Sequence, residues 1–545
     1  MRVHRELAST LDACIASIGA IQGAARTQGV RGTPRWPAIV LGTPKGWTGP
    51  KVVNGLAVEG TFRAHQVPLG AVRTDPQQLT ALETWLRSYE PERLFDERGR
   101  LVSPLAALAP KGTRRMGMSP HTNGGSSKPL VVPDFSTYAV DVKQHGTVHH
   151  ESTRPLGAML RDVYTQNPGT FRLFCPDETN SNRLGAVFEV ETRAFQEPTF
   201  PSDDHVSSEG RVMEVLSEHN LEGWLEGYVL TGRHGVFATY EAFALIVASM
   251  TTQHAKWLEV SRALAWRKPV PSLNYLLTST CWRNDHNGFS HQGPGFMDTI
   301  LSKKGTVARI YFPPDANCLL SVYDHCLRSS NCVNLVIIDK QPELQWLDIA
   351  DAREHCARGV STWDWAGTET KGAMLDVILA CAGDTATLET LAAAAWLREN
   401  APSLSVRVVN IVDLMRLFST REHPHGMSSE RFTELFTDDT HVVFTFHGYP
   451  GAIHQVLHAR PNAARFHVRG YKEEGTTTTP FDMVVLNEAS RFHIVMDALR
   501  RSRTRVPNAP DLVARCEASL AHHRAYIAEH LDDVPEIRDF MWPRT

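Results

Sequence analysis

The sequence predicts an α/β protein with mainly parallel sheets. Apolar runs of strand length alternate along the chain with helical patterns, and this alternation is typical of parallel sheets covered by helices. The runs are apolar almost throughout, as in strands that are buried on both faces. Polar segments rich in glycine or histidine follow several of them, at the strand ends where active sites of open α/β sheets gather.

The individual elements follow from local patterns in chain order. Apolar residues spaced by three or four predict a helix over 7–25, and the next apolar run, 36–41, predicts a buried strand that ends before Pro44. A helix over 384–397 begins at a capping residue, Asp384 or Thr385. Further strands are predicted at 273–277, 307–312, 333–338, 375–382, 406–412 and 442–446.

Polar stretches divide the chain. Residues 116–128 are rich in Gly and Ser and predict a linker, 198–210 an exposed loop, and 346–370 a break between two strand-rich regions. We therefore expect three α/β regions that meet near 120 and 350, with a mainly parallel sheet in each of the last two.

The composition is that of an ordinary globular protein. The 545 residues carry a net charge of −4, so no basic excess exists to bind nucleic acid. No uninterrupted run of about 18 apolar residues occurs and no secretory pattern opens the chain, so we expect no membrane span. The nine cysteines are scattered without C-x-x-C spacing. A reduced, cytoplasmic protein is the simplest expectation.

Two candidate segments lie early in the chain, at 43–51 and 62–68, and contain Lys45 and His65. A Lys and a His in strand-end loops can bind an anionic substrate or handle a proton. The alternative is a turn with a solvated Lys and an ordinary His. Neither segment is a P-loop, because the G-x-x-x-x-G-K-[ST] pattern is absent.

Two more candidates lie at 176–183 and 282–292. In the first, Ser181 and Arg183 can grip a phosphate, although a helix N-cap formed by Asp177 or Thr179 accounts for the segment equally well. The second is the most polar segment beside an apolar strand, and burying it as inert core would leave many polar groups without partners. A metal site there is disfavoured, because His286 and His291 do not share a helix face and no third ligand is obvious.

Glutamates recur every four residues in 211–235. The ordinary interpretation is an amphipathic helix with a solvated acidic face, which we expect for Glu214, Glu222 and Glu226. Periodicity alone does not distinguish Glu218 from them.

Long motifs give the chain a family resemblance. It resembles the xylulose-5-phosphate/fructose-6-phosphate phosphoketolases, which are thiamine-diphosphate enzymes related to transketolase, from its first residues to 535–538. The motifs are TPKGWTGPK (43–51), FRAHQVPL (62–69), WLRSY (85–89), PDETNSNRL (176–184), EVLSEHNLEGWLEGYVLTGRHG (214–235), DHNGFSHQ (285–292), PPDANCLLSVYDHCLRS (313–329), VDLM (412–415), FHGYP (446–450) and RGYKEEGTTTTPFDM (469–483).

The resemblance implies the thiamine-diphosphate-binding, transketolase-like fold: three-layer α/β/α domains with mainly parallel sheets. The family's first domain holds the cofactor's diphosphate through Mg²⁺ with a Gly-Asp-Gly motif. The only similar string here, at 382–385, lacks the second Gly. The expected division is a remnant of the diphosphate-binding domain at 1–120, the pyrimidine-binding domain at 121–350 and a C-terminal α/β domain at 351–545. A truncated gene, a frameshifted copy or one half of a split enzyme would explain the missing motif.

The resemblance also implies roles for single residues. Glu218 matches the glutamate that hydrogen-bonds the aminopyrimidine of thiamine diphosphate and so helps to form the ylide. Tyr240 and Phe243 match residues that pack on this ring. The basic residues of the reaction centre are Lys45, His65 and His291, and the residues matched to the entry and grip of substrate and phosphate are Ser181, Arg183, His286, Asn287 and Lys340. Two departures are visible, Asn284 in place of Gln and Cys175 in place of Gly.

The implied reaction is an aldehyde-lyase reaction. The C2–C3 bond of xylulose 5-phosphate or fructose 6-phosphate breaks, releasing glyceraldehyde 3-phosphate or erythrose 4-phosphate, and phosphate carries the two-carbon unit away as acetyl phosphate. A transketolase-like transferase and an inactive fragment or partner subunit remain alternatives. The expected partners are the sugar phosphate, inorganic phosphate, and a second copy of the chain or a separate diphosphate-binding chain.

Overall fold

A computed structural model of the chain describes residues 2–30, 32, 34–65, 67–121, 126–370 and 374–543. The described chain forms two compact units, Met1–Ser119 and Pro120–Thr545. Part of the predicted linker at 116–128 lies outside the described residues.

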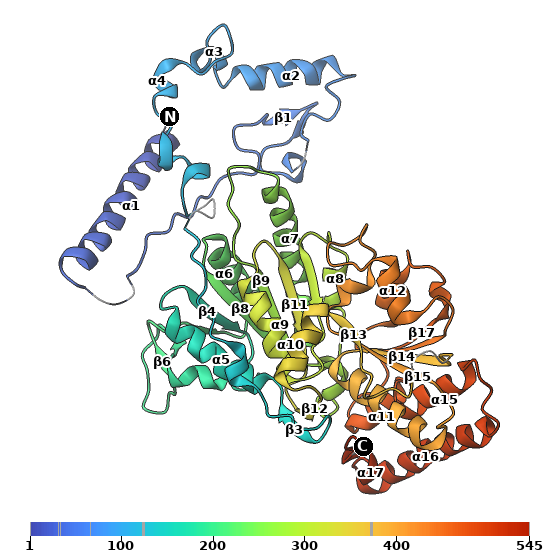
Figure 1. The fold of residues 1–545 in the computed structure, drawn as a ribbon. Coiled ribbons are helices and arrows are strands. Elements are labelled where there is room, and N and C mark those ends of the chain that lie inside the picture. The colour runs from blue at the N-terminus through green and yellow to red at the C-terminus, as the bar shows by residue number, and fades with distance from the viewer. Residues whose placement is uncertain are drawn as a thin grey trace. The chain divides into compact units, whose positions relative to one another are not determined.

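The first unit is helical with little core. Among its described apolar residues, Val58 and Leu69 are buried. Its elements are α1 (Arg2–Thr27), β1 (Val52–Val53), β2 (Leu56–Ala57), α2 (Pro76–Arg87), α3 (Pro91–Leu94) and α4 (Ser103–Ala106), drawn in blue in Figure 1.

The predicted helix over 7–25 is confirmed as α1, but the strand predicted at 36–41 is wrong. This segment is irregular, and Val40 is 95% exposed. A strand needs a neighbour to satisfy its backbone groups, and the described residues of this unit offer none to it.

The helix α1 also qualifies the expectation about membranes. It is long and apolar enough to cross a membrane by length and composition, and the stretch Val3–Thr27 is not buried. A single such helix near the start of a chain is weak evidence, because a signal sequence passes the same test.

The described residues of the second unit form two large sheets and one two-stranded sheet. The larger has eight strands, all parallel, in the order β10-β11-β9-β8-β4-β7-β5-β6. The strands are β4 (Phe171–Cys175), β5 (Arg193–Ala194), β6 (Val206–Ser207), β7 (Val212–Glu214), β8 (His234–Tyr240), β9 (Leu273–Ser279), β10 (Ala308–Tyr311) and β11 (Val333–Ile337). The helices of this region are α5 (Thr153–Gln166), α6 (Glu218–Leu230), α7 (Ala248–Arg262), α8 (Phe296–Leu301), α9 (Ala316–Arg328) and α10 (Ile349–Arg358).

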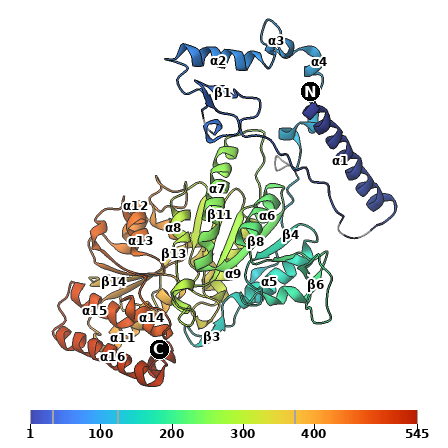
Figure 2. The same ribbon diagram turned by 180° about the vertical axis from the view of Figure 1, so that it is seen from behind.

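The smaller sheet has the order β13-β15-β14-β16-β17, and only its β13–β15 pair is antiparallel. The strands are β13 (Val360–Thr362), β14 (Val377–Ala382), β15 (Val406–Ile411), β16 (Val442–Phe446) and β17 (Phe466–Arg469). The helices are α11 (Asp384–Asn400), α12 (Ser429–Phe436), α13 (Pro450–Leu457), α14 (Pro480–Leu486), α15 (Arg491–Arg501), α16 (Ala509–His530) and α17 (Pro535–Arg538). Helix α15 packs against both α11 and α16 (Figure 2). A separate antiparallel pair joins β3 (Val148–Glu151) to β12 (Pro342–Gln345).

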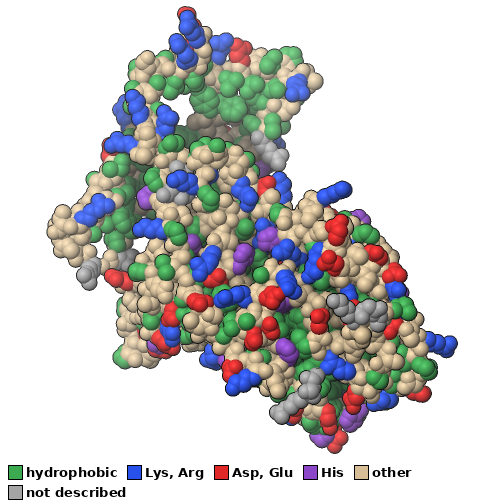
Figure 3. Space-filling view, in the orientation of Figure 1, with side chains coloured by type: hydrophobic (Ala, Val, Ile, Leu, Met, Phe, Trp, Pro, Cys, Tyr) green, Lys and Arg blue, Asp and Glu red, His purple; other side chains and the backbone are tan. Residues whose placement is uncertain are grey.

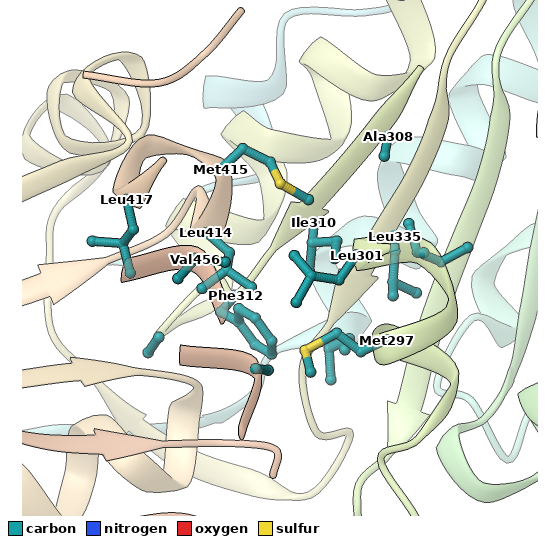
Figure 4. Close-up of a cluster of buried hydrophobic side chains, with 14 of the residues drawn as sticks. Met297, Leu301, Ala308, Ile310, Phe312, Leu335, Leu414, Met415, Leu417 and Val456 are labelled. Carbon is teal, nitrogen blue, oxygen red and sulfur yellow. The ribbon is translucent and has the colours of Figure 1, made fainter. Parts of the chain in front are cut away.

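The two sheets share a hydrophobic core, because apolar runs from both are buried in one cluster. Figure 4 shows Met297, Ile310 and Phe312 of the first sheet region beside Leu414 and Val456 of the second. The expectation of mainly parallel sheets in both regions is confirmed. The face drawn in Figure 3 carries Lys and Arg interspersed with Asp and Glu, in keeping with the net charge of −4.

Candidate active site

The ends of three parallel strands bring together Ser181, Tyr240 and Lys340. Tyr240 ends β8, while Ser181 and Lys340 follow β4 and β11. The Ser181 Oγ lies 2.5 Å from the Tyr240 hydroxyl and accepts a hydrogen bond of 3.0 Å from the Lys340 Nζ. The same ammonium lies 3.9 Å from the Tyr240 ring centroid, so its charge is held over the ring face. A cation and two hydroxyls at one point suit the binding of an anion.

Aromatic rings continue this cluster. The rings of Tyr240 and Phe243 are nearly parallel, with centroids 6.0 Å apart and an interplanar angle of 11°. The His291 ring meets Phe243 edge-on at 5.1 Å and lies 6.5 Å from Tyr240. Residues from two separate stretches of the chain therefore form one aromatic surface beside the Ser181–Lys340 pair.

Glu218 is linked to the cluster through Asp177, for which the sequence predicts no role beyond that of a helix cap. Asp177 follows β4 and accepts hydrogen bonds from the Tyr240 backbone N–H and, at 3.4 Å, from the Thr239 hydroxyl. Burial raises the pKa of Asp177, and the nearby Glu218 carboxylate raises it further. Glu218 is half-buried at the first position of α6. The helix that Asp177 was expected to cap is absent here, since the next element, Gly185–Glu189, is preceded by Leu184.

The other predicted substrate residues have different partners. Arg183 has a left-handed backbone (φ 61°), and its Nε donates to Glu151 Oε1 at 2.6 Å. Asn287 donates to Asn284 Oδ1 at 3.2 Å, and the exposed His286 lies 4.0 Å from the Asp285 carboxylate. Their convergence with Ser181 and Lys340 on one anion site stays a prediction.

The two departures from the family pattern are buried. Asn284 donates to the Thr280 carbonyl at 2.8 Å, and Cys175 ends β4, where burial raises the pKa of its thiol.

Lys45 and His65 belong to the first unit. The Lys45 Nζ lies 2.7 Å from the His65 Nδ1, so the structure brings the two predicted basic residues together. Both lie at a surface of that unit.

The expectation of a solvated glutamate face on α6 is wrong. Glu222 is fully buried and accepts a hydrogen bond from the Tyr275 hydroxyl, while Glu226 is half-buried. Burial raises the pKa of Glu222 to about 8 and that of Glu226 to about 7. Glu214 lies on β7 and pairs with Arg193. The acidic residues face inward because α6 lies against β8 and β9, and helical spacing does not reveal which face is covered.

The buried Glu222 predicts a pH-dependent stability. Its pKa in the folded protein lies above the ordinary value of 4.5, so the folded state binds this proton more tightly than the unfolded state does. Its contribution is complete below pH 4.5 and is lost as the pH rises toward about 8. Glu222→Gln should remove this loss of stability, because glutamine has no proton to release. The free energy of unfolding at pH 8 should therefore be higher in the variant than in the native chain, by about 1.4 kcal/mol for each unit by which the Glu222 pKa is raised.

Chemical denaturation at pH 5 and pH 8 measures this effect. Glu434→Gln, at a side chain that is 63% exposed, is the matched control and should leave the pH slope unchanged. Equal slopes for the native chain and Glu222→Gln would contradict the assignment.

The described residues fit one part of thiamine diphosphate. The Tyr240–Phe243 pair offers an aromatic surface to its ring, with Glu218 nearby, but no such fit exists for the Mg²⁺-bound diphosphate. Among the described residues, the one group with metal-ligand geometry is Glu241, Cys281 and His447, which is buried. Its sulfur and nitrogen donors are not those that Mg²⁺ prefers.

A separate cavity of about 220 Å³ lies elsewhere in the second unit and is lined by residues of both sheet regions. Its three arginines are paired, Arg283 with Glu343, Arg491 with Glu389 and Arg538 with Asp539. These ion pairs leave less charge to attract an anion than the Ser181–Lys340 cluster does.

Family comparison agrees with these observations. A family model described as D-xylulose 5-phosphate/D-fructose 6-phosphate phosphoketolase matches residues 154–329, and models of its N-terminal and C-terminal domains match 1–127 and 340–542. A probable phosphoketolase of Nitrosomonas europaea is 54% identical over 545 residues, which is 99% of this chain and 69% of that protein. One of Rhodopseudomonas palustris (strain BisB5) is 56% identical over 543 residues, with the same two coverages.

Solved transketolases show the same fold at low identity. That of Pichia stipitis, in complex with sedoheptulose 7-phosphate, has a TM-score of 0.51 at 15% identity, covering 78% of this chain and 52% of that one. That of Leishmania mexicana has a TM-score of 0.51 at 14% identity, covering 79% and 54%. This chain thus has the transketolase-like α/β fold and spans about half of these transketolases. On the family models and the curated relatives, it belongs to the phosphoketolase family, a family of thiamine-diphosphate-dependent lyases.

Proposed function

We propose that this chain supplies the substrate side and the cofactor-ring side of a phosphoketolase. The reaction is the phosphate-dependent cleavage of xylulose 5-phosphate or fructose 6-phosphate to acetyl phosphate and an aldose phosphate. The observation that carries the proposal is the Ser181–Tyr240–Lys340 cluster. It places hydrogen-bond donors that can bind an anion beside an aromatic surface at the strand ends.

The residues of the cluster have separate tasks. The Lys340 ammonium and the Ser181 hydroxyl bind a phosphate group. Tyr240 holds the Ser181 hydroxyl in place through the hydrogen bond between the two side chains. Thiamine diphosphate, when bound, supplies the nucleophilic carbon and the electron sink. Glu218 holds a proton at the cofactor's pyrimidine ring, and His291 lies on the aromatic surface where it can deliver a proton to a hydroxyl that leaves as water.

Acetyl phosphate formation tests the function. The chain is mixed with a separate protein that supplies the diphosphate-binding residues. The mixture is incubated with the ketose phosphate, inorganic phosphate and cofactor, and acetyl phosphate is measured as ferric hydroxamate colour. Colour that requires phosphate supports a phosphoketolase. Transfer of the two-carbon unit to an added aldose phosphate, without such colour, would favour a transketolase-like transferase instead.

We further propose that Mg²⁺ and the diphosphate are held by a separate chain that carries diphosphate-binding residues, whether this chain pairs with it directly or as a dimer with a second copy of itself. Apolar side chains are exposed just before and on α6, in the segment 241–247 that contacts it, and in the segment 289–291 that contacts 241–247, which suits contact with a partner. They are Leu216 (88% exposed), Trp224 (47%), Leu245 (46%), Ile246 (40%) and Phe289 (77%). Sedimentation velocity should show a dimer or a mixed complex. The cytoplasmic location stays a prediction.

Arg183→Lys should raise the KM for phosphate several-fold. The substitution keeps the charge but loses the planar guanidinium that grips two oxygens at once. Phosphate titration of the active assembly measures the effect, with Arg154→Lys as control, because Arg154 also binds Glu151 but is more exposed. An unchanged KM in Arg183→Lys, or an equal change in the control, would remove Arg183 from the phosphate site.

A further inference from the structure

The two sheets of the second unit bring the carboxyl ends of five strands to one buried place. A polar residue stands one or two positions after each strand end, and every one of these residues is at most 4% exposed. They are Glu241 after β8, Cys281 after β9, Asp339 after β11, Asp384 after β14 and His447 after β16.

The central contact joins His447 of the smaller sheet to Glu241 of the larger. The His447 Nε2 lies 2.6 Å from the Glu241 Oε1, and the other carboxylate oxygen accepts the Cys281 backbone N–H at 2.9 Å. The Trp282 indole N–H donates to the His447 carbonyl at 2.8 Å. Three hydrogen bonds therefore hold the end of β16 and the ends of β8 and β9 in one network.

The pair has the character of a buried ion pair. Burial lowers the pKa of His447, but the neighbouring carboxylates, Glu241 first, outweigh it and raise the pKa above the ordinary value of 6.5. Although Cys281 lies close enough to complete a group of three possible metal ligands, the 2.6 Å between the Nε2 and Oε1 atoms is a hydrogen-bond distance, shorter than the usual separation of two ligands on one ion.

A second link runs parallel to the first. Asp384 accepts the Asp339 backbone N–H at 2.6 Å, and Asp339 in turn accepts both the backbone N–H and the hydroxyl of Thr280 at 2.8 Å. The ends of β14 and β16 approach each other closely at Gly383 and His447. Gly383 has φ 113°, and a Cβ there would lie 2.7 Å from the His447 Cβ.

The network holds the backbone that carries the candidate active site. Tyr240 immediately precedes Glu241, and Lys340 immediately follows Asp339. Asn284, at the start of the loop with His286 and His291, is bonded to the Thr280 carbonyl. The side chains that meet at Ser181 thus project from residues whose neighbours are fixed by the smaller sheet.

We propose that His447 is a positioning residue of the anion site: through Glu241 it fixes the ends of β8 and β9, so that Tyr240 and Lys340 meet Ser181 before the anion binds. The C-terminal sheet thereby takes part in substrate binding without touching the substrate. Preformed geometry of this kind increases affinity, because the anion does not have to order the site. The inference rests on the proposed function, which places the phosphate group at Ser181 and Lys340.

Binding of inorganic phosphate to the full chain, measured by calorimetry at pH 7, tests the inference without requiring turnover. We expect about 10-fold weaker binding in Lys340→Ala, which loses one charged contact, and a loss of about 3-fold to 10-fold in His447→Leu. His447→Gln, which returns a donor to Glu241, should recover most of the affinity. The matched control is His355→Leu, at a buried histidine of α10 that is bonded to Ser361 and Asn410 of the smaller sheet, and this variant should bind phosphate as the native chain does.

Folding is checked by near-UV circular dichroism. If His447→Leu does not fold because Glu241 is left as an unpaired buried charge, the double variant Glu241→Leu/His447→Leu removes both partners and takes its place. Native affinity in a folded variant without the pair, or an equal loss in His355→Leu, would overturn the inference while leaving the proposed function intact. Native affinity in Lys340→Ala, or no binding by the native chain, would overturn the proposed function and the inference with it.

Discussion

The 545-residue chain by itself is expected to bind thiamine diphosphate weakly and to form little or no acetyl phosphate. The cofactor's charge lies in its diphosphate, which proteins bind largely through a bridging Mg²⁺. The sequence contains no Gly-Asp-Gly motif, and the buried Glu241, Cys281 and His447 do not suit Mg²⁺. The loss of a contact worth about 3 kcal/mol weakens binding more than 100-fold.

Calorimetry with the cofactor and Mg²⁺ on the isolated chain measures this directly. Thiamine without its diphosphate is the matched ligand. If only the ring side is present, the two ligands should bind with similar affinity, and Mg²⁺ should make little difference. Micromolar binding of the diphosphate form together with acetyl phosphate production would show that this chain holds the diphosphate itself.

The first unit gives a separate reason to expect a partner. Val40 and Leu41 are 95% and 60% exposed, and Trp36 is 54% exposed. These residues belong to the apolar run at 36–41, for which the sequence predicts a buried strand. The chemistry of the run is that of a strand covered by other elements, and the described unit does not cover it. Such surface favours association or aggregation.

The sheets could be predicted because each apolar run carries its own signal. The runs at 273–277, 307–312, 333–338, 375–382, 406–412 and 442–446 all became strands, within about two residues at most ends. The run at 36–41 carries the same signal and did not. A strand is stable only when another strand or helix meets it, and no local pattern contains that information.

The candidate site, too, contains residues that could be predicted from the sequence and residues that could not. The family resemblance pointed to Ser181, Tyr240, Phe243, His291 and Lys340, which the structure brings together. Spacing could not show that Glu222 turns inward, because the direction of a helix face depends on where the helix is packed.

The Glu241–His447 contact was also beyond the sequence. Its two residues are 206 positions apart, and neither lies in a pattern that predicts the other. A signal existed only in the strand ends. Each of these residues follows a buried strand directly, which is where parallel sheets place their functional groups.

In an assembly that forms acetyl phosphate, Glu218→Ala is expected to lower turnover by about two to four orders of magnitude, the range typical of a lost acid–base group. Glu218 begins α6 and is half-buried, close enough to Asp177 to raise the pKa of that carboxyl. Under the proposed function, its removal takes away the carboxyl that holds a proton at the cofactor's pyrimidine ring. Stability should change little, since a partly exposed acidic residue in a first helical turn contributes about 0.3–1 kcal/mol.

Initial rates of acetyl phosphate formation measure the loss, and thermal unfolding checks the fold. Glu218→Gln keeps the size and a hydrogen-bonding group but cannot exchange a proton, so it should lose nearly as much turnover as Glu218→Ala. The adjacent, exposed His219 provides the control, and His219→Ala should retain most of the rate. If Glu218→Gln turned over at a near-native rate, the proton-holding role would be wrong. If His219→Ala were as slow as Glu218→Ala, the loss would reflect disturbance of the α6 N-terminus rather than the chemistry of one carboxyl.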